Sequence, residues 1–300
     1  MTRAALSDQD YETFRTFLED ACGIVLGENK HYLVISRLSR LMADEGVATL
    51  SELVTHLQDS RKRQLRERVV EAMTTNETFW FRDTFPFDIL RDVIFPDLAE
   101  RRVRNPRIWS AACSSGQEPY SISMTVQEYL ASRPGSFSDL QIVATDISPT
   151  ILEEAKQASY DTPALARGLS LERKQKHFTQ QRPGYWQARP EIRNRVRFSQ
   201  ANLLQSYSLL GRFDVIFCRN VLIYFSSASK ADILGRMARA LNPGGYLFLG
   251  SSESITQYSD EFEMVRCPRG SVYRVKPGLA ARRTPPELRS VLRPSSSGKA

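Results

Sequence analysis

The spacing of apolar and polar positions changes once along this chain, and the change divides it in two. From about residue 7 to residue 74, apolar residues recur three or four positions apart, the spacing of amphipathic helices. The pattern predicts a first helix that starts at Ser7 and ends before Gly23, followed by helices over about 30–44, 49–59 and 64–73. We therefore expect an all-α N-terminal domain over residues 1–75.

Beyond residue 85, short apolar runs alternate with helical stretches. After a helix over 85–102, the runs predict strands at 108–109, 140–146, 196–198, 215–218 and 246–250, and an antiparallel pair at 262–265 and 271–275. Helices should start at Glu118 and cover 149–159 and 230–241, the last ended by Pro243-Gly244-Gly245. This alternation indicates an α/β fold with a mostly parallel sheet covered on both faces. The 35 residues or so from 161 to 195 exceed a simple connection, which predicts a small subdomain.

The segment between the two parts, TTNETFWFRD at residues 74–83, is unusual for a linker because it places three aromatic residues in a row beside polar ones. A linker between domains is ordinarily polar and exposed. Two interpretations stay open for this segment. It is either a buried packing hinge or part of the wall of a ligand pocket.

Composition excludes several classes of protein. The chain is 41% hydrophobic and 25% charged, as ordinary globular proteins are, and it has no apolar run long enough to span a membrane. Its N-terminus carries acids where a signal peptide needs an apolar core. The four cysteines are scattered, which favours free thiols in a reducing compartment and predicts no metal site. We expect a cytoplasmic protein.

The net charge of +7 is concentrated at the C-terminus. From Lys276 onward the chain has six basic residues and one acid, so the remainder carries only about +2. The charge therefore gives little support to a nucleic-acid partner. Residues 277–300, which contain two consecutive prolines and end in PSSSGKA, are expected to form a disordered basic tail.

The strongest candidate for chemistry is RIWSAACSSGQEPYSISM at residues 107–124, a strand, a turn of small residues and a helix start. The turn has Gly116 alone, where a dinucleotide-binding turn has three glycines, and Glu118 at the helix start would repel a pyrophosphate. The turn therefore suits a cofactor with a cationic amino group and no phosphate, such as S-adenosylmethionine. Asp146 ends the next strand, where it can accept hydrogen bonds from ribose hydroxyls. Asn202 and the backbone of Leu203 follow the third strand, where they can contact an adenine edge.

Five segments in order, TTNETFWFRD, WSAACSSGQEPYSISM, ATDIS, FDVIFCRNVLIYF and LNPGGYLFLGSSES, resemble the CheR family of chemotaxis receptor methyltransferases. The resemblance covers residues 7–275. It implies an all-α domain, then a Rossmann-like class I S-adenosylmethionine-dependent methyltransferase domain over 76–276 with a small β-subdomain insert at about 161–197. It also implies methyl transfer to glutamate side chains of chemoreceptors, with S-adenosylhomocysteine as product.

The resemblance assigns roles to particular residues. Asn76, Thr78 and Arg82 resemble the residues at the methionine end of the cofactor, and Arg82 would pair with its carboxylate. The further cofactor-side residues that it implies, together with those above, are Gly116, Glu118, Asp146, Asn202, Leu203, Arg219 and Asn220. Tyr224 resembles the family's proposed active-site tyrosine, and we count Tyr224 and Arg82 as candidate catalytic residues.

A basic face on the second predicted helix offers a docking surface. Lys30, Arg37 and Arg40 share this face, which is either simply solvated or directed at the glutamate-rich helical bundle of a receptor. A receptor C-terminal peptide is a further candidate partner for the β-subdomain. Two rival functions stay open: a related methyltransferase that acts on RNA or a small molecule, and a non-catalytic module that senses S-adenosylmethionine.

Overall fold

The N-terminal part of the chain forms a helical module with its own core. In the computed structural model, which describes residues 7–277, this module consists of α1 (Asp8–Cys22), α2 (His31–Asp44), α3 (Leu50–Gln58) and α4 (Arg63–Met73). The Ser7 and Thr49 side chains cap α1 and α3, and Gly23 ends α1 with φ +80°. The predicted N-terminal helices are confirmed. Residues 278–300 of the expected tail lie outside the described part of the chain.

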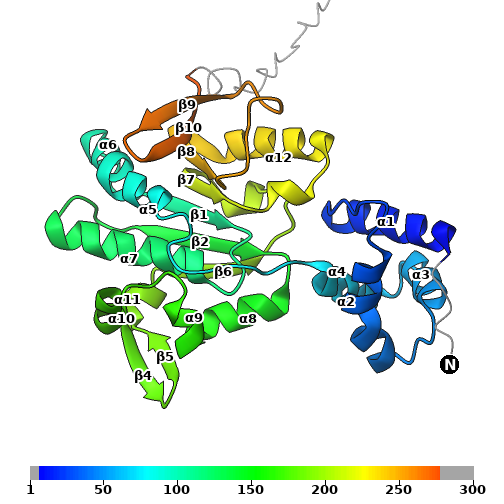
Figure 1. The fold of residues 1–300 in the computed structure, drawn as a ribbon. Coiled ribbons are helices and arrows are strands. Elements are labelled where there is room, and N and C mark those ends of the chain that lie inside the picture. The colour runs from blue at the N-terminus through cyan, green and yellow to red at the C-terminus, as the bar shows by residue number, and fades with distance from the viewer. Residues whose placement is uncertain (1–6, 278–300) are drawn as a thin grey trace, which may run out of the picture.

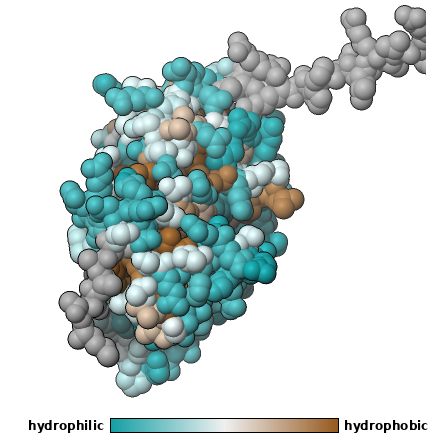
Figure 2. Space-filling model, turned by 90° about the vertical axis from the view of Figure 1, so that its right-hand side faces the viewer, coloured by the Kyte–Doolittle hydropathy of each residue, from teal (hydrophilic) through white to brown (hydrophobic). Residues whose placement is uncertain are grey.

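The helical module packs around a buried apolar cluster that is separate from the cores of the sheet. Its largest members include Tyr11, Phe14, Leu18 and Leu38. In Figure 1 the module, coloured blue, lies beside the rest of the molecule and is joined to it through the segment after α4. Figure 2 views the molecule from this side, and the surface there is mostly hydrophilic with small hydrophobic areas between.

A seven-stranded sheet organises the second part, in the order β6-β2-β1-β7-β8-β10-β9. The parallel strands are β1 (Arg107–Ala111), β2 (Gln141–Asp146), β6 (Val196–Gln200), β7 (Phe213–Cys218) and β8 (Leu241–Leu249), and β10 (Gly270–Val275) and β9 (Phe262–Cys267) pair antiparallel. The predicted mostly parallel sheet is confirmed. Strand order reverses between β1 and β7, so the carboxyl ends of these two strands border the crevice where α/β sheets bind ligands.

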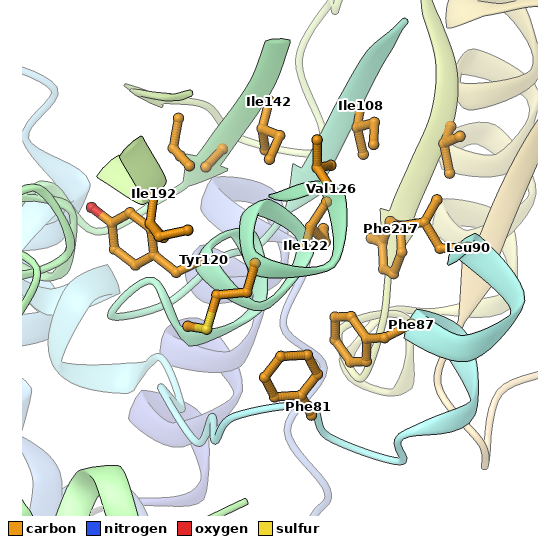
Figure 3. Packing of buried hydrophobic residues seen from close by; sticks show 14 of the residues in the cluster. Phe81, Phe87, Leu90, Ile108, Tyr120, Ile122, Val126, Ile142, Ile192 and Phe217 are labelled. Atoms are coloured by element: carbon orange, nitrogen blue, oxygen red, sulfur yellow. The ribbon is translucent and has the colours of Figure 1, made fainter. Parts of the chain in front are cut away.

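Helices cover both faces of this sheet. One face packs against α5 (Phe85–Ile89), the π-helical segment η1 (Leu90–Ile94), α6 (Phe95–Glu100), α7 (Gln117–Ser132) and α8 (Pro149–Gln157), and the other against α12 (Ser227–Ala240). Successive strand residues point to opposite faces, so Ile108 joins one core and Trp109 the other. Figure 3 shows Ile122 and Val126 of α7 facing the sheet beside Ile108 and Phe217. The helix expected over 85–102 is confirmed as one continuous helical run over 85–100, with a π-helical turn at Leu90–Ile94.

A second, three-stranded sheet has the order β3-β5-β4 and consists of β3 (Ser159–Asp161), β5 (Tyr185–Ala188) and β4 (Phe178–Arg182). The short helices α9 (Thr162–Ala166), α10 (Leu171–His177) and α11 (Pro190–Arg193) accompany it. This small sheet starts at Ser159, slightly before the suggested insert. The helix predicted to reach residue 159 ends at Gln157, because Ala158 takes a left-handed conformation (φ 50°) and the chain turns into β3.

The residues expected to end the helix over 230–241, Pro243-Gly244-Gly245, lie in a strand. Strand β8 begins at Leu241 and runs through this proline-glycine stretch, with a shift in its register against β7. Gly244 has φ +71°, and the guanidinium of Arg101 donates to the carbonyl oxygens of Pro243 (2.7 Å) and Gly244 (3.1 Å). These hydrogen bonds from another element stabilise an irregular strand, which local turn propensity does not reveal.

Candidate functional site

A cavity of about 250 Å³ lies between the helical module and the carboxyl edge of the sheet. Both parts of the chain line it. The predicted residues that line it are Asn76, Thr78, Arg82, Glu118, Asp146, Asn202, Leu203, Arg219, Asn220, Tyr224, Lys30 and Arg37. Twelve of the fourteen predicted site residues thus meet around one cavity, and Gly116 and Arg40 are absent from its lining.

The turn after β1 brings the backbone close to this cavity. Ala112 and Ser114 line it and have left-handed backbone conformations, with φ 60° and 51°. Ser114 donates its amide hydrogen to Oδ2 of Asp146 (2.8 Å) and its hydroxyl hydrogen to the carbonyl oxygen of Asn76 (2.8 Å). The turn therefore joins the segment before the sheet to the end of β2.

Gly116 ends this turn as the N-cap of α7, with φ +95°. A side-chain carbon there would lie 3.0 Å from the hydroxyl of Tyr160 and 3.1 Å from the ring of Tyr120. The backbone conformation and the close packing against these two tyrosines therefore require glycine, and the contact of Gly116 with a cofactor stays a prediction.

Asp146 ends β2 with its carboxylate at the cavity. The side chain is buried and accepts hydrogen bonds from the amides of Ser114 (2.8 Å) and Ser148 (3.1 Å). Burial raises the pKa of Asp146, and the hydrogen bonds from these amides oppose the increase. A fixed carboxylate at the second strand is suited to ribose hydroxyls.

A buried cluster of charged side chains, here called the Glu118 cluster, lies at the start of α7 and consists of Glu118, Asp83 and Arg219. Arg219 donates to Oε2 of Glu118 (2.9 Å) and to Oδ2 of Asp83 (2.7 Å), and its side chain is only 1% exposed. The other oxygen of Glu118 accepts a hydrogen bond from the hydroxyl of Ser110 (2.7 Å). Two carboxylates with one guanidinium leave one negative charge at this end of the cavity. That charge favours a cationic amino group, whereas the Arg219 guanidinium is committed to the chain's own groups.

The segment at residues 74–83 has both of the roles that the sequence left open. Trp80 and Phe81 are buried, and Phe81 and Phe87 lie together against α7 in Figure 3. Between these aromatic anchors and α4, residues Asn76, Thr78 and Phe79 line the cavity. The segment is therefore a packing hinge and a cavity wall at once.

Arg82 is the cation of this segment that faces the cavity. Its guanidinium lies over the ring of Phe79, 5.3 Å from the ring centroid, and donates to the carbonyl oxygen of Glu77 (3.1 Å). The carbonyl of Arg82 accepts from the buried Arg219 (2.8 Å), and its neighbours Phe81 and Asp83 have positive φ. The backbone is thus held in an unusual conformation while the guanidinium keeps donors for a carboxylate.

Asn202 has a structural role that we did not predict. Its Nδ2 donates to the carbonyl oxygen of Ala21 at the end of α1 (2.8 Å), and its Oδ1 accepts the amide hydrogen of Leu204 (2.9 Å). Both ends of the amide are therefore occupied within the chain. What is left for an adenine edge is the remaining hydrogen and lone pair of Asn202 and the backbone of Leu203.

Tyr224 is held on a short turn at the opposite rim. It ends the 3₁₀ segment η3 (Leu222–Tyr224), and its carbonyl oxygen accepts the amide hydrogen of Val25 from the helical module (2.8 Å). Asn220, just before this turn, has φ +58°. The loop after β7 therefore touches the helical module while its tyrosine lines the cavity.

The helical wall of the cavity was missed by the sequence reasoning. It is formed mainly by Ile24, Val25, Leu26 and Leu33, in and after the loop that follows α1. The only signal for Ile24, Val25 and Leu26 was an apolar run between two glycines, which is equally typical of a buried loop, and Leu33 is one apolar residue of a helix.

The basic face of α2 is corrected in part. The guanidinium of Arg37 donates to the carbonyl oxygens of Met73 (2.5 Å) and Thr74 (3.0 Å) and to Oγ1 of Thr75 (2.8 Å). It ties α2 to the end of α4, so it is committed to the fold. Lys30 and Arg40 are exposed and stay candidates for docking.

Among residues 7–277, Cys22 lines the cavity, and burial raises the pKa of its thiol to about 11. Burial raises the pKa of the Cys113 and Cys218 thiols, which disfavours thiolates. No group of three metal-binding side chains occurs in the same described range, and no helix there is long and apolar enough to cross a membrane.

Taken together, the lining suits S-adenosylmethionine. Asp146 offers a carboxylate to ribose hydroxyls, the Glu118 cluster offers negative charge to an ammonium group, and Arg82 offers donors to a carboxylate. The apolar residues of the helical wall offer cover for a flat base. The lining therefore offers groups complementary to a ribose, an ammonium group and a carboxylate.

Comparisons with known proteins agree with this site. Residues 9–74 match the family description "CheR methyltransferase, all-alpha domain", and residues 76–271 match "CheR methyltransferase, SAM binding domain". The chain is 54% identical to the chemotaxis protein methyltransferase Cher2 of Pseudomonas putida, over 89% of this chain and 98% of that one. It is 53% identical to chemotaxis protein methyltransferase 1 of Pseudomonas aeruginosa (90% and 99% covered) and 34% identical to the chemotaxis protein methyltransferase of Escherichia coli (87% and 90% covered). The chain therefore belongs to the CheR methyltransferase family and is a methyltransferase that uses S-adenosylmethionine.

Proposed function

We propose that this enzyme transfers the methyl group of S-adenosylmethionine to glutamate side-chain carboxylates of chemoreceptor cytoplasmic domains, forming γ-glutamyl methyl esters for chemotactic adaptation. The observation that carries the proposal is that the residues predicted to bind the cofactor line the same cavity as Tyr224. The relatives, which are chemotaxis protein methyltransferases, support a role in chemotaxis. The proposal places the reaction in the cytoplasm.

The residues that would hold the cofactor divide among its parts. Asp146 would accept from the ribose, the Glu118 cluster would face the amino group, Arg82 would pair with the carboxylate, and Asn202 with the Leu203 backbone would border the adenine. When bound, S-adenosylmethionine supplies an electrophilic sulfonium methyl group.

The chain's own contribution to the reaction is alignment. A glutamate carboxylate with a pKa of about 4.3 is already ionised at neutral pH, so no general base is needed to create the nucleophile. Orientation of the two reactants can contribute roughly 7–11 kcal/mol. Tyr224, at the rim of the cavity, is proposed to donate a hydrogen bond that orients the incoming carboxylate.

The proposal is tested by incubating the enzyme with methyl-labelled S-adenosylmethionine and purified receptor cytoplasmic fragments. We expect label on glutamate that mild base releases, as an ester requires. Cofactor binding without transfer would favour the sensing module, and transfer to RNA or a small molecule but to no receptor would favour the other rival.

The role of Tyr224 is tested separately by Tyr224→Phe. We expect slower transfer with little change in cofactor affinity, because the hydroxyl is proposed to contact the substrate carboxylate. Unchanged turnover under saturating substrate would remove this role.

We also propose that the exposed cations of α2 and of the residue before it dock the acidic receptor helices. Arg37→Glu combined with Arg40→Glu should weaken methylation most at low salt, where charge attraction is least screened. Because Arg37 also holds the end of α4, Arg40→Glu alone is the cleaner variant. If Arg40→Glu and Lys30→Glu both leave methylation intact at low salt, the docking surface is elsewhere.

A further inference from the structure

The loop after β7 carries two site residues in a conformation that it would not hold by itself. Asn220 has φ +58°, a left-handed conformation that asparagine tolerates better than most residues. Two residues later the chain enters the η3 turn that ends with Tyr224. Such a loop, partly exposed and irregular, needs hydrogen-bond partners for its backbone amides.

Glu253 provides those partners from a different part of the chain. Its Oε2 accepts the amide hydrogens of Asn220 (2.7 Å) and Gly250 (2.7 Å), and its Oε1 accepts that of Ile223 (3.3 Å). The amide of Glu253 in turn donates to the carbonyl oxygen of Gly250 (3.0 Å). One carboxylate thus joins both ends of the Asn220–Ile223 stretch to the end of β8. Hydrogen bonds of this kind, with an ionised acceptor, are about twice as strong as neutral ones.

The close approach of the two loops explains why glycine precedes this glutamate. A side-chain carbon at Gly250 would lie 2.6 Å from Nδ2 of Asn220, 2.7 Å from Oε2 of Glu253 and 2.9 Å from the amide nitrogen of Asn220. The segment Gly250-Ser251-Ser252-Glu253 therefore allows the loop after β7 to rest directly against the end of β8. Glu253 and Gly250 are themselves absent from the lining of the cavity, whereas their partner Asn220 lines it.

We propose that Glu253 is a positioning residue for methyl transfer: its carboxylate fixes the loop after β7 so that Tyr224 and Asn220 keep their places at the cavity. The proposal rests on the proposed function only in that transfer to a receptor glutamate is one of its readouts. A shift of about 1 Å in a reacting group can lower turnover about 100-fold. The hydrogen bonds of Glu253 hold the turn that carries Tyr224, so loss of these hydrogen bonds should reduce turnover more than cofactor affinity.

The experiment compares Glu253→Ala and Glu253→Gln with the wild type and with Glu263→Gln. Glu263 is a matched control on β9, where its carboxylate accepts a hydrogen bond from Arg274 at a partly exposed pair. In Glu253→Ala all three amides lose their acceptor. In Glu253→Gln the amide oxygen can still serve Asn220 and Gly250 while the NH₂ group faces the Ile223 amide, so the variant affects mainly the Tyr224 turn.

We expect turnover to fall about 10- to 100-fold in Glu253→Ala and less in Glu253→Gln, with a smaller change in cofactor affinity by calorimetry. Amide hydrogens in residues 219–225 should exchange faster, while the melting temperature stays near that of the wild type. The Glu263→Gln control should match the wild type in turnover and in exchange of this segment.

A double-mutant cycle with Tyr224→Phe separates positioning from general stability. If Glu253 acts through Tyr224, its substitution should cost much less in the Tyr224→Phe background than in the wild type. Additive losses, unchanged exchange in residues 219–225, or a loss explained by a lower melting temperature would overturn the proposal. If the wild type itself transfers no methyl group to receptor fragments, the proposed function fails, and hydrogen exchange still decides whether Glu253 braces the loop.

Discussion

The two walls of the cavity are built by different means. On the sheet side, polar side chains stand at strand ends and are fixed by the chain's own hydrogen bonds, as Asp146 is by Ser114 and Glu118 by Arg219. On the helical side, the lining is mainly apolar and lies in and around a loop, with Val25 and Leu33 as examples.

Only a few polar contacts connect the two walls. Val25 donates its amide hydrogen to the carbonyl oxygen of Tyr224, Asn202 donates to that of Ala21, and Glu71 of α4 accepts from the hydroxyl of Ser148 at the start of α8. A hydrogen bond contributes about 1 kcal/mol net, so these contacts supply only a few kcal/mol. We infer from this difference that the sheet wall recognises the cofactor and that the helical wall encloses it.

The largest loss of cofactor affinity should come from a substitution in the sheet wall. Asp146→Asn replaces an ionised acceptor that is worth about 1.5–3 kcal/mol, which corresponds to a loss of cofactor affinity of about 10- to 150-fold. Asp139→Asn, just before the opposite end of the same strand, is the control. Calorimetry with S-adenosylhomocysteine measures both, and equal affinity in the wild type and Asp146→Asn would assign ribose recognition to other groups.

The pH dependence of binding sharpens the same point. Burial raises the pKa of Asp146, so its carboxylate becomes protonated at a higher pH than an ordinary aspartate does. Cofactor affinity should therefore fall as the pH is lowered, beginning above the usual range of aspartate titration. If cofactor affinity stays constant across this pH range, Asp146 does not contact the bound cofactor.

A smaller loss of cofactor affinity is expected from a substitution where the two walls are in contact. Gly23 has φ +80°, and a side-chain carbon there would lie 2.3 Å from the ring of Phe225 on the sheet side. Gly23→Ala should therefore push the helical wall outward and weaken cofactor binding several-fold, in addition to the backbone strain of about 1 kcal/mol. Gly46→Ala is a matched control, because Gly46 has φ +67° and no atom within 4 Å of the added carbon. Equal cofactor affinities in the two variants would mean that contact between the walls does not affect binding.

The smallest effect on cofactor affinity should come from a substitution in a region outside both walls. Glu128 of α7 pairs with Arg173 of α10 (2.8 Å) and lies 3.8 Å from His177. Burial alone would raise the pKa of Glu128, but hydrogen bonds from Arg173 and His177 outweigh it and lower the pKa to about 2. The stability that this pair contributes is therefore present above the ordinary glutamate pKa and is lost as the pH falls toward 2.

Glu128→Gln should lower the free energy of unfolding by about 1–2 kcal/mol at neutral pH, and the gap to the wild type should close on acidification. Urea unfolding at several pH values measures this gap. Cofactor affinity should hardly change, since Glu128 lies away from the cavity; a large loss of affinity would contradict the division of roles between the two walls.

The two walls also differ in how far the sequence could predict them. The end of β2 was predictable, because an apolar run followed by an acid marks a buried strand and its exit, and Asp146 lies there. The helical wall was not, because apolar residues such as Val25 give no sign of which surface they will face. Their contact with the cavity arises only when distant parts of the chain pack together.

Local signals did not reveal two further features. A lone glycine after a strand suggested close approach to a ligand, but not that φ +95° and packing against Tyr160 require glycine at position 116. Pro243-Gly244-Gly245 was expected only to end a helix, whereas hydrogen bonds from Arg101 hold that stretch in β8. The role of Glu253 was hidden for a similar reason, since its partners lie some 30 residues earlier in the chain.

The most direct test of the two-walled cavity is ultraviolet cross-linking of the full-length protein with labelled S-adenosylmethionine, followed by mapping of the labelled peptides. An excess of S-adenosylhomocysteine serves as the competitor that removes specific label. The account predicts competed label in peptides from both walls, over residues 22–37 of the helical module and over 112–118 or 201–224 of the sheet side. Competed label confined to peptides outside both walls, such as those of the small sheet at residues 159–188, would contradict it.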